Sequence, residues 1–87
     1  MVSDDDILAG IALLAETEGI FTEPAGGTTV AAARQLAERG VLPRDEPVVI
    51  CITGNGYKTI EALAGRTREP IHIERSLAAF EAAVAPR

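Results

Sequence analysis

The sequence predicts an α/β protein with its elements in the order α-α-β-α-β-α. Two observations predict this class. Apolar residues recur at helical spacing over residues 4–18, and an unbroken apolar run, Val-Val-Ile-Cys-Ile, fills residues 48–52. A run that is apolar at every position is typical of a parallel strand covered on both faces. We therefore expect a parallel sheet with helices on it, in a single domain over residues 1–87.

The first predicted element is a helix over residues 4–18. Ser3 and the three aspartates after it are typical of a helix start, because a hydroxyl caps free N–H groups and carboxylates suit the positive end of the helix dipole. Gly19 is a typical left-handed stop. Both ends of this helix are thus predicted by residue type.

The second predicted element is a helix that ends at Gly40. Pro24 and the two glycines soon after it favour a loop, because proline fixes φ and glycine loosens the backbone. We therefore expect the helix to begin only after them, with Thr28 or Thr29 as its cap.

The second half predicts the strands and two further helices. After the strand at 48–52 we expect a Thr-Gly-Asn-Gly turn and a short helix over about residues 59–64. Residues 71–73 predict a second strand, and Ser76 is the expected cap of a last helix. Two strands cannot make an independent parallel sheet, so the sheet is expected to be incomplete and to belong to something larger.

Composition excludes several function classes. Thirteen acidic and eight basic residues give a net charge of −5, which disfavours nucleic acid and anionic membrane surfaces as partners. The longest apolar runs are far shorter than the ~20 residues of a membrane span. The single cysteine, Cys51, rules out an internal disulfide and suggests a reducing compartment, so we expect a cytoplasmic protein.

The turn after the apolar strand is a candidate ligand site. Open α/β sheets bind ligands at the carboxyl ends of their strands, and Thr53 is the first residue after this one. The alternative is an ordinary turn in which Asn55 and Gly56 adopt the required backbone angles. A P-loop is excluded, because Tyr57 stands where its second glycine must be.

No catalytic or metal-binding residue is predicted. Lys58 is the only lysine, and nothing near it in the sequence would make it a nucleophile, so a solvated or anion-pairing role is the better interpretation. His72 has no second histidine and only a distant cysteine, which does not support a metal site.

Two segments together resemble the threonine synthase family. They are Glu-Gly-Ile-Phe-Thr-Glu-Pro-Ala-Gly-Gly at 18–27 and Ile-Thr-Gly-Asn-Gly-Tyr-Lys-Thr at 52–59. The resemblance continues at both ends and covers nearly all of the 87 residues. Tyr57 is the visible departure, because this family usually has leucine there.

This resemblance implies a fold-type II pyridoxal-phosphate enzyme, a lyase of threonine biosynthesis. The family converts O-phospho-L-homoserine and water to L-threonine and phosphate. Thr53 would hydrogen-bond the pyridine nitrogen of the cofactor. Gly54, Asn55 and Gly56 would shape the wall beside the cofactor ring. Ala25 and Gly26 would lie near the ring, and Glu23 would help to fix the loop.

The family's Schiff-base lysine, in a Ser-Phe-Lys-Asp context, has no counterpart here. The chain therefore resembles a carboxyl-terminal fragment that is inactive alone and binds no pyridoxal phosphate covalently. Its expected partners are a lysine-bearing synthase remainder or a second copy of itself. The alternative function is a stand-alone, non-catalytic interaction module derived from this fold.

Overall fold

The computed structural model describes residues 1–86, and its first element is helix α1, Asp4–Glu18. The Ser3 hydroxyl accepts a hydrogen bond from the Asp6 amide, and the Asp6 carboxylate accepts one from the Ser3 amide. This reciprocal capping satisfies two free N–H groups at the helix start. Gly19 ends the helix with a positive φ of 67°, which glycine adopts without steric cost. The predicted first helix is confirmed at both ends.

Helix α2, Pro24–Glu38, begins earlier than the sequence predicts. Its N-cap is Glu23, so the predicted threonine cap is wrong. Pro24 occupies the first helical position, where its fixed φ suits a helix and its missing N–H is not needed. The hydroxyls of Thr28 and Thr29 donate to the carbonyls four residues before them instead of capping the helix. The proline therefore starts this helix rather than delaying it.

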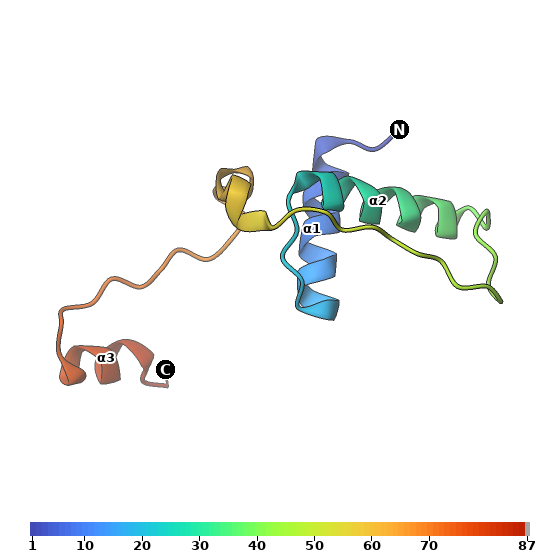
Figure 1. Cartoon of the computed structure of the whole chain (residues 1–87). Helices are drawn as coiled ribbons and strands as arrows, with labels where there is room; N and C mark the ends of the chain where they lie inside the picture. Colours follow the sequence, from blue (N-terminus) through green and yellow to red (C-terminus); the bar gives the residue numbers. More distant parts are fainter. Residues whose placement is uncertain (87) are drawn as a thin grey trace.

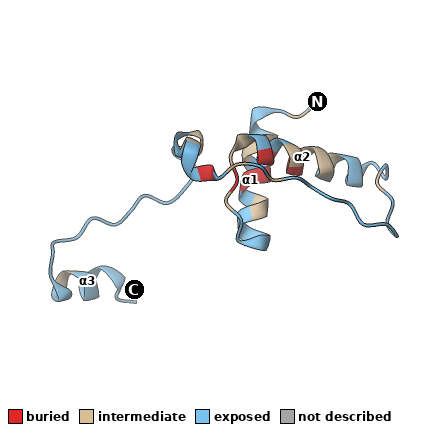
Figure 2. Ribbon diagram, viewed as in Figure 1, coloured by how far each residue is buried: buried red, intermediate tan, exposed pale blue. Residues whose placement is uncertain are grey.

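The core lies where α1 and α2 pack against each other (Figures 1 and 2). Ile11, Val30 and Ala31 are the buried apolar side chains among the described residues. Gly10 and Gly27 face each other at the crossing, because a Cβ on Gly10 would meet the Gly27 carbonyl. The two backbones thus approach each other directly at this point.

The predicted parallel sheet is not formed among residues 1–86. Residues 48–52 are extended but belong to no strand, and the second predicted strand, 71–73, is likewise unpaired in the described part of the chain. The exposed fraction is 47% at Val48, 86% at Val49 and 40% at Ile50. A strand exists only through hydrogen bonds to a neighbouring strand, and the described residues place none beside this run.

Two further helices follow, with the predicted order but altered geometry. Helix η1, Gly56–Leu63, is a 3-10 helix with non-helical angles at Thr59, where the sequence predicts a regular short helix. Helix α3, Leu77–Val84, begins as predicted after Ser76, whose hydroxyl accepts a hydrogen bond from the Ala79 amide. Residue type therefore predicted the α3 cap but not the 3-10 geometry of η1.

The molecule is elongated, and α3 lies apart from the other helices at the end of an extended segment (Figure 1). The radius of gyration is 17.6 Å, whereas a compact domain of this length has about 12 Å. Figure 2 shows the buried residues gathered around α1, α2 and the start of η1. The packed part of the chain is therefore formed by these three elements.

Candidate functional site

Two segments that are distant in sequence meet at the start of α2. Thr22 and Asn55 form an isolated antiparallel β-bridge. The Glu23 amide donates to the Gly54 carbonyl at 3.1 Å, and the Gly56 amide donates to the Phe21 carbonyl at 3.0 Å. These two bonds join residues 21–23 to the turn after the apolar run.

Thr22 lies at the centre of this junction and is fully buried. Its hydroxyl donates to the Glu23 carbonyl at 3.1 Å and lies 3.4 Å from the Gly54 carbonyl, so the buried polar group is satisfied. Gly26 of α2 packs on the same side chain, because a Cβ there would lie 2.8 Å from the Thr22 Cβ. Thr22 therefore connects the start of α2 to the turn.

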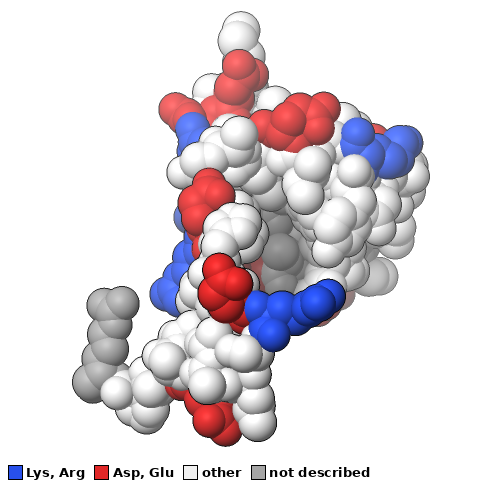
Figure 3. Space-filling model, turned by 90° about the vertical axis from the view of Figure 1, so that its left-hand side faces the viewer, with Lys and Arg blue, Asp and Glu red and all other residues white. Residues whose placement is uncertain are grey.

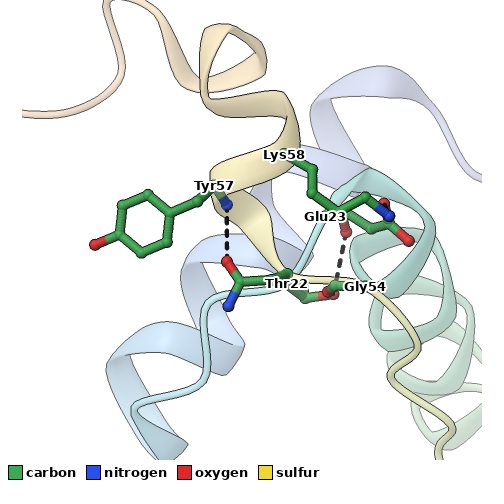
Figure 4. A network of polar contacts seen from close by, with 6 residues as sticks. Thr22, Glu23, Gly54, Tyr57 and Lys58 are labelled. Carbon is green, nitrogen blue, oxygen red and sulfur yellow. Dashed lines mark hydrogen bonds and ion pairs between the residues drawn. The ribbon is translucent and has the colours of Figure 1, made fainter.

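Glu23 and Lys58 lie on the α2 side of the turn, and their side chains approach each other (Figure 4). The distance between Lys58 Nζ and Glu23 Oε2 is 3.5 Å. The Glu23 side chain is 21% exposed and the Lys58 side chain is 67% exposed. A Cβ on Gly54 would collide with the Glu23 carboxylate, so the carboxyl group lies directly over that glycine.

Phe21 and Tyr57 lie together at the start of η1. Their rings meet edge to face, with centroids 5.1 Å apart and an interplanar angle of 79°. A Cβ on Gly56 would collide with the Phe21 ring, which explains why a side chain is absent there. The Asn55 side chain accepts a hydrogen bond from the Tyr57 amide at 2.9 Å and caps the start of η1. Aromatic packing and this cap fix the second half of the turn.

The structure brings together most of the residues that the resemblance implies. Glu23, Gly54, Asn55 and Gly56 meet in the junction, and Gly26 packs beneath it. Ala25 and Thr53 lie at its edges and are exposed. Packing within and between the two segments accounts for the three glycines without a ligand. The role of these seven residues at a cofactor stays a prediction.

The sequence did not point to Phe21, Thr22 or the partner of Lys58. Pro24 could have predicted the extended backbone of Glu23, because the residue before a proline tends to be extended. The burial of Thr22 had no such signal, because part of its cover comes from a segment 32 residues away. Contacts of this range are set by the tertiary structure.

Charged side chains of both signs are interspersed with uncharged surface over the face shown in Figure 3.

Among residues 1–86, the carboxyl group of Asp6 has a clearly shifted pKa. The Ser3 amide, and next the Ser3 hydroxyl, lower the pKa of Asp6 from its ordinary value of 3.8. Asp6 belongs to the α1 cap rather than to the junction, so this shift reports on helix capping.

Residues 1–54 match the family of pyridoxal-phosphate dependent enzymes. The chain belongs to this family. Membership implies the fold-type II architecture, and pyridoxal phosphate is the family's cofactor. The match ends at Gly54, so it includes α1, α2, the apolar run and the first two residues of the turn.

Curated members of the pyridoxal-phosphate dependent enzyme family are similar over most of this chain. It is 42% identical over 73 residues to threonine synthase of Methanocaldococcus jannaschii, covering 84% of this chain and 18% of that enzyme. It is 37% identical over 83 residues to threonine synthase of Methanosarcina acetivorans, covering 95% of this chain and 20% of that enzyme. The resemblance to threonine synthase is confirmed, and the chain spans about a fifth of these relatives.

Two findings concern classes of site elsewhere in the chain. None of the helices described here is long and apolar enough to cross a membrane. Residues 1–86 contain no group of three or more histidine, cysteine, aspartate and glutamate side chains arranged to hold a metal ion.

Proposed function

We propose that the chain forms one wall of the pyridoxal-phosphate site of a threonine synthase-like enzyme and is inactive alone. The observation that supports this proposal is the turn at 53–56, which is hydrogen-bonded to the start of α2 in a chain of this family. Thr53 directly precedes the held Gly54 and is exposed, so its hydroxyl is available to a ligand. The complete site would need the other four-fifths of the enzyme.

The residues of this chain suit one side of the cofactor. When bound, pyridoxal phosphate supplies an electron sink for amino-acid chemistry. Thr53 would hydrogen-bond the pyridine nitrogen, and as a neutral partner it would leave that nitrogen largely unprotonated. Gly54, Asn55 and Gly56 would shape the wall beside the ring. Residues 23–26 would hold the neighbouring loop.

The reaction we propose for the assembled enzyme is that of threonine synthase. O-phospho-L-homoserine and water would be converted to L-threonine and phosphate, in the cytoplasm, with this chain orienting the cofactor ring. The proposal rests on the likeness of 37% to 42% identity to two enzymes of that name. The sheet that is incomplete here would be completed by strands from the remainder of the enzyme, beside residues 48–52.

Lys58 is not the residue that we expect to hold the cofactor. It is the only lysine of the chain, it is 67% exposed, and its ammonium group faces the Glu23 carboxylate. Treating the isolated chain with pyridoxal phosphate, then with borohydride, should give no stoichiometric label at Lys58 by peptide mapping. Site-specific, stoichiometric labelling there would overturn the proposed inactivity of the isolated chain.

The test of the cofactor wall is a pair of substitutions at Thr53. The chain is combined with a threonine synthase from which the corresponding segment has been deleted, and turnover and cofactor affinity are measured. Thr53→Val keeps the shape but removes the hydroxyl, and should cost ~1–3 kcal/mol, or roughly ten- to a hundredfold. Thr53→Ser keeps the hydroxyl and should retain most of the function. If the valine variant equals the wild type in both measurements, Thr53 is only a turn residue.

The second candidate function is a non-catalytic interaction module. It is favoured by the exposed apolar surfaces of the run at 48–52 and of α3, where Leu77 is 71% and Phe80 is 51% exposed. A genomic neighbour that encodes the lysine-bearing remainder would support the enzyme, and its absence would support the module. Recovery of activity in the mixing experiment would exclude a purely structural role.

A further inference from the structure

The N-cap of α2 does not use its side chain as N-caps usually do. Serine, threonine, aspartate or asparagine at this position commonly accepts hydrogen bonds from the free N–H groups of the first helical turn. Glu23 makes no such bond with its own helix. Its carboxyl group instead lies over Gly54 and faces Lys58. The helix start therefore forgoes a side-chain cap in favour of a contact with another segment.

Gly54 is the residue that makes this contact possible. A Cβ there would collide with the Glu23 carboxyl group, as described above. The backbone of Gly54 does not have a positive φ, so conformational freedom is not the reason for glycine at this position. Space for the carboxylate is the reason that the structure gives. The main chain of Glu23 also donates to the Gly54 carbonyl, so the two residues are joined twice.

Lys58 closes the contact from the far side. It lies in the first turn of η1, and its amide donates to the Asn55 carbonyl at 3.2 Å. Glu61 follows three residues later on the same helix, yet the ion pair that the described residues form is with Glu23. The pair therefore spans the turn instead of running along η1.

We infer that Glu23 and Lys58 form an ion-pair latch across Gly54, which holds the turn at 53–56 on the start of α2. Both are positioning residues, since neither needs to touch a ligand to act. The existence of the latch concerns this chain alone. Its consequence for the cofactor, through the orientation of Thr53, rests on the proposed function.

The latch is expected to be modest in strength. Lys58 is mostly exposed, so water and salt screen the attraction, and exposed ion pairs contribute little. Breaking it should leave the chain folded, because the Thr22 junction and the α1–α2 core do not depend on it. Loosening should be local, at the bridge between residues 21–23 and the turn.

The experiment measures hydrogen exchange of the Gly56 amide by NMR on the full chain. This amide donates to the Phe21 carbonyl in the bridge, and neither Gly56 nor Asn55 is changed in any variant below. Glu23→Gln and Lys58→Met should each raise its exchange rate about two- to fivefold. The double variant should show no further increase. Effects that simply add, or no change in either variant, would overturn the latch.

Matched variants separate the latch from general loosening. Glu61→Gln removes an exposed carboxylate close to Lys58 in sequence and should leave Gly56 exchange unchanged. Lys58→Arg keeps the positive charge, so the Gly56 amide should keep the protection from exchange that it loses in Lys58→Met. Gly54→Ala should displace the carboxylate and should not add to Glu23→Gln. In 1 M salt the difference between the wild type and Glu23→Gln should shrink. An equal effect of Glu61→Gln would contradict the assignment.

A second readout tests positioning of the turn itself. Backbone order parameters of Thr53 and Gly54 should fall in Glu23→Gln. In Lys58→Arg, which keeps the ion pair, they should stay at the wild-type values. No cofactor is present in either measurement. Failure of the mixing experiment with Thr53 variants would therefore count against the cofactor wall alone, whereas unchanged exchange and order parameters would count against the latch alone.

Discussion

Gly10 and Gly27 permit the close crossing of α1 and α2, and this makes a prediction opposite to helix propensity. Alanine in a helix is favoured over glycine by roughly 0.5–1 kcal/mol. A Cβ on Gly10 would, however, meet the Gly27 carbonyl, so Gly10→Ala must push the helices apart. We expect it to lower the free energy of unfolding by about 1–3 kcal/mol, measured by urea titration of the circular dichroism signal.

The control for this prediction lies on the same helix. Thr17 is exposed and far from the crossing, so Thr17→Ala should change the free energy of unfolding by no more than about 0.5 kcal/mol. A Gly10→Ala variant that is more stable than the wild type would mean that the close crossing does not limit the core.

Asp6 carries a pH dependence whose sign follows from its cap. The Ser3 amide and hydroxyl stabilise the carboxylate, so its pKa in the folded chain lies below the ordinary value of 3.8. The resulting stability is present above the unfolded-state pKa and is lost as pH falls through the lower, folded-state pKa. An NMR titration should show the Asp6 carboxyl group titrating at lower pH than an ordinary aspartate.

Ser3→Ala tests the origin of this shift. It removes the hydroxyl but keeps the amide, so the pKa of Asp6 should rise only part of the way to 3.8. The same change removes the acceptor for the Asp6 amide and should destabilise α1 by about 0.5–2 kcal/mol. An unchanged titration curve would show that the hydroxyl has no part in the shift.

At the scale of elements, α3 is the part of the chain with the least support. Its eight residues are fewer than the ~12–15 that an isolated helix needs for appreciable stability in water. Its large apolar side chains are exposed, at 71% for Leu77, 51% for Phe80 and 57% for Val84. We expect α3 amides to exchange almost as fast as those of an unstructured peptide in the isolated chain.

The same amides should become protected when α3 gains a partner. Mixing with the synthase remainder, or raising the chain concentration, should slow their exchange. Strong protection in a dilute, monomeric sample would contradict this expectation, because it would mean that α3 is stable without packing.

At the scale of the whole molecule, the exposed run at 48–52 predicts association. Its main-chain groups pair with no strand among residues 1–86, and its side chains are apolar on both faces. Such a run is the usual template for pairing with another strand. Sedimentation should show a mass that increases with concentration. Val49→Lys should weaken this association without loss of helix content, because Val49 is 86% exposed in the single chain.

Val41→Lys is the matched control for Val49→Lys. Val41 is also an exposed valine, at 63%, but lies in the connection after α2 rather than in the apolar run. It should leave the sedimentation profile unchanged. Equal weakening by both variants would indicate a general effect of charge, and a concentration-independent monomer would contradict the expected association itself.

The sequence predicted what short-range chemistry decides. Ser3, Gly19 and Ser76 act within one turn of their own helices, so their caps were predictable from residue type and confirmed. The threonine synthase likeness was also predictable, because each of the two glycine-containing segments, 18–27 and 52–59, is an unbroken stretch of sequence. Pro24 was misinterpreted because a proline both ends and starts helices, and its neighbours did not decide between the two.

What depends on distant residues was decided by the tertiary structure alone. The burial of Thr22, the place of Glu23 over Gly54 and the pairing of Lys58 all require two segments about 30 residues apart to meet. The run at 48–52 shows the same division. Its side chains predict that it must be covered, but strand formation needs hydrogen bonds from a neighbour, and the described chain places none there. The tendency of a segment to be helical or extended is set by its own sequence, whereas the pairing of a strand depends on a neighbouring strand.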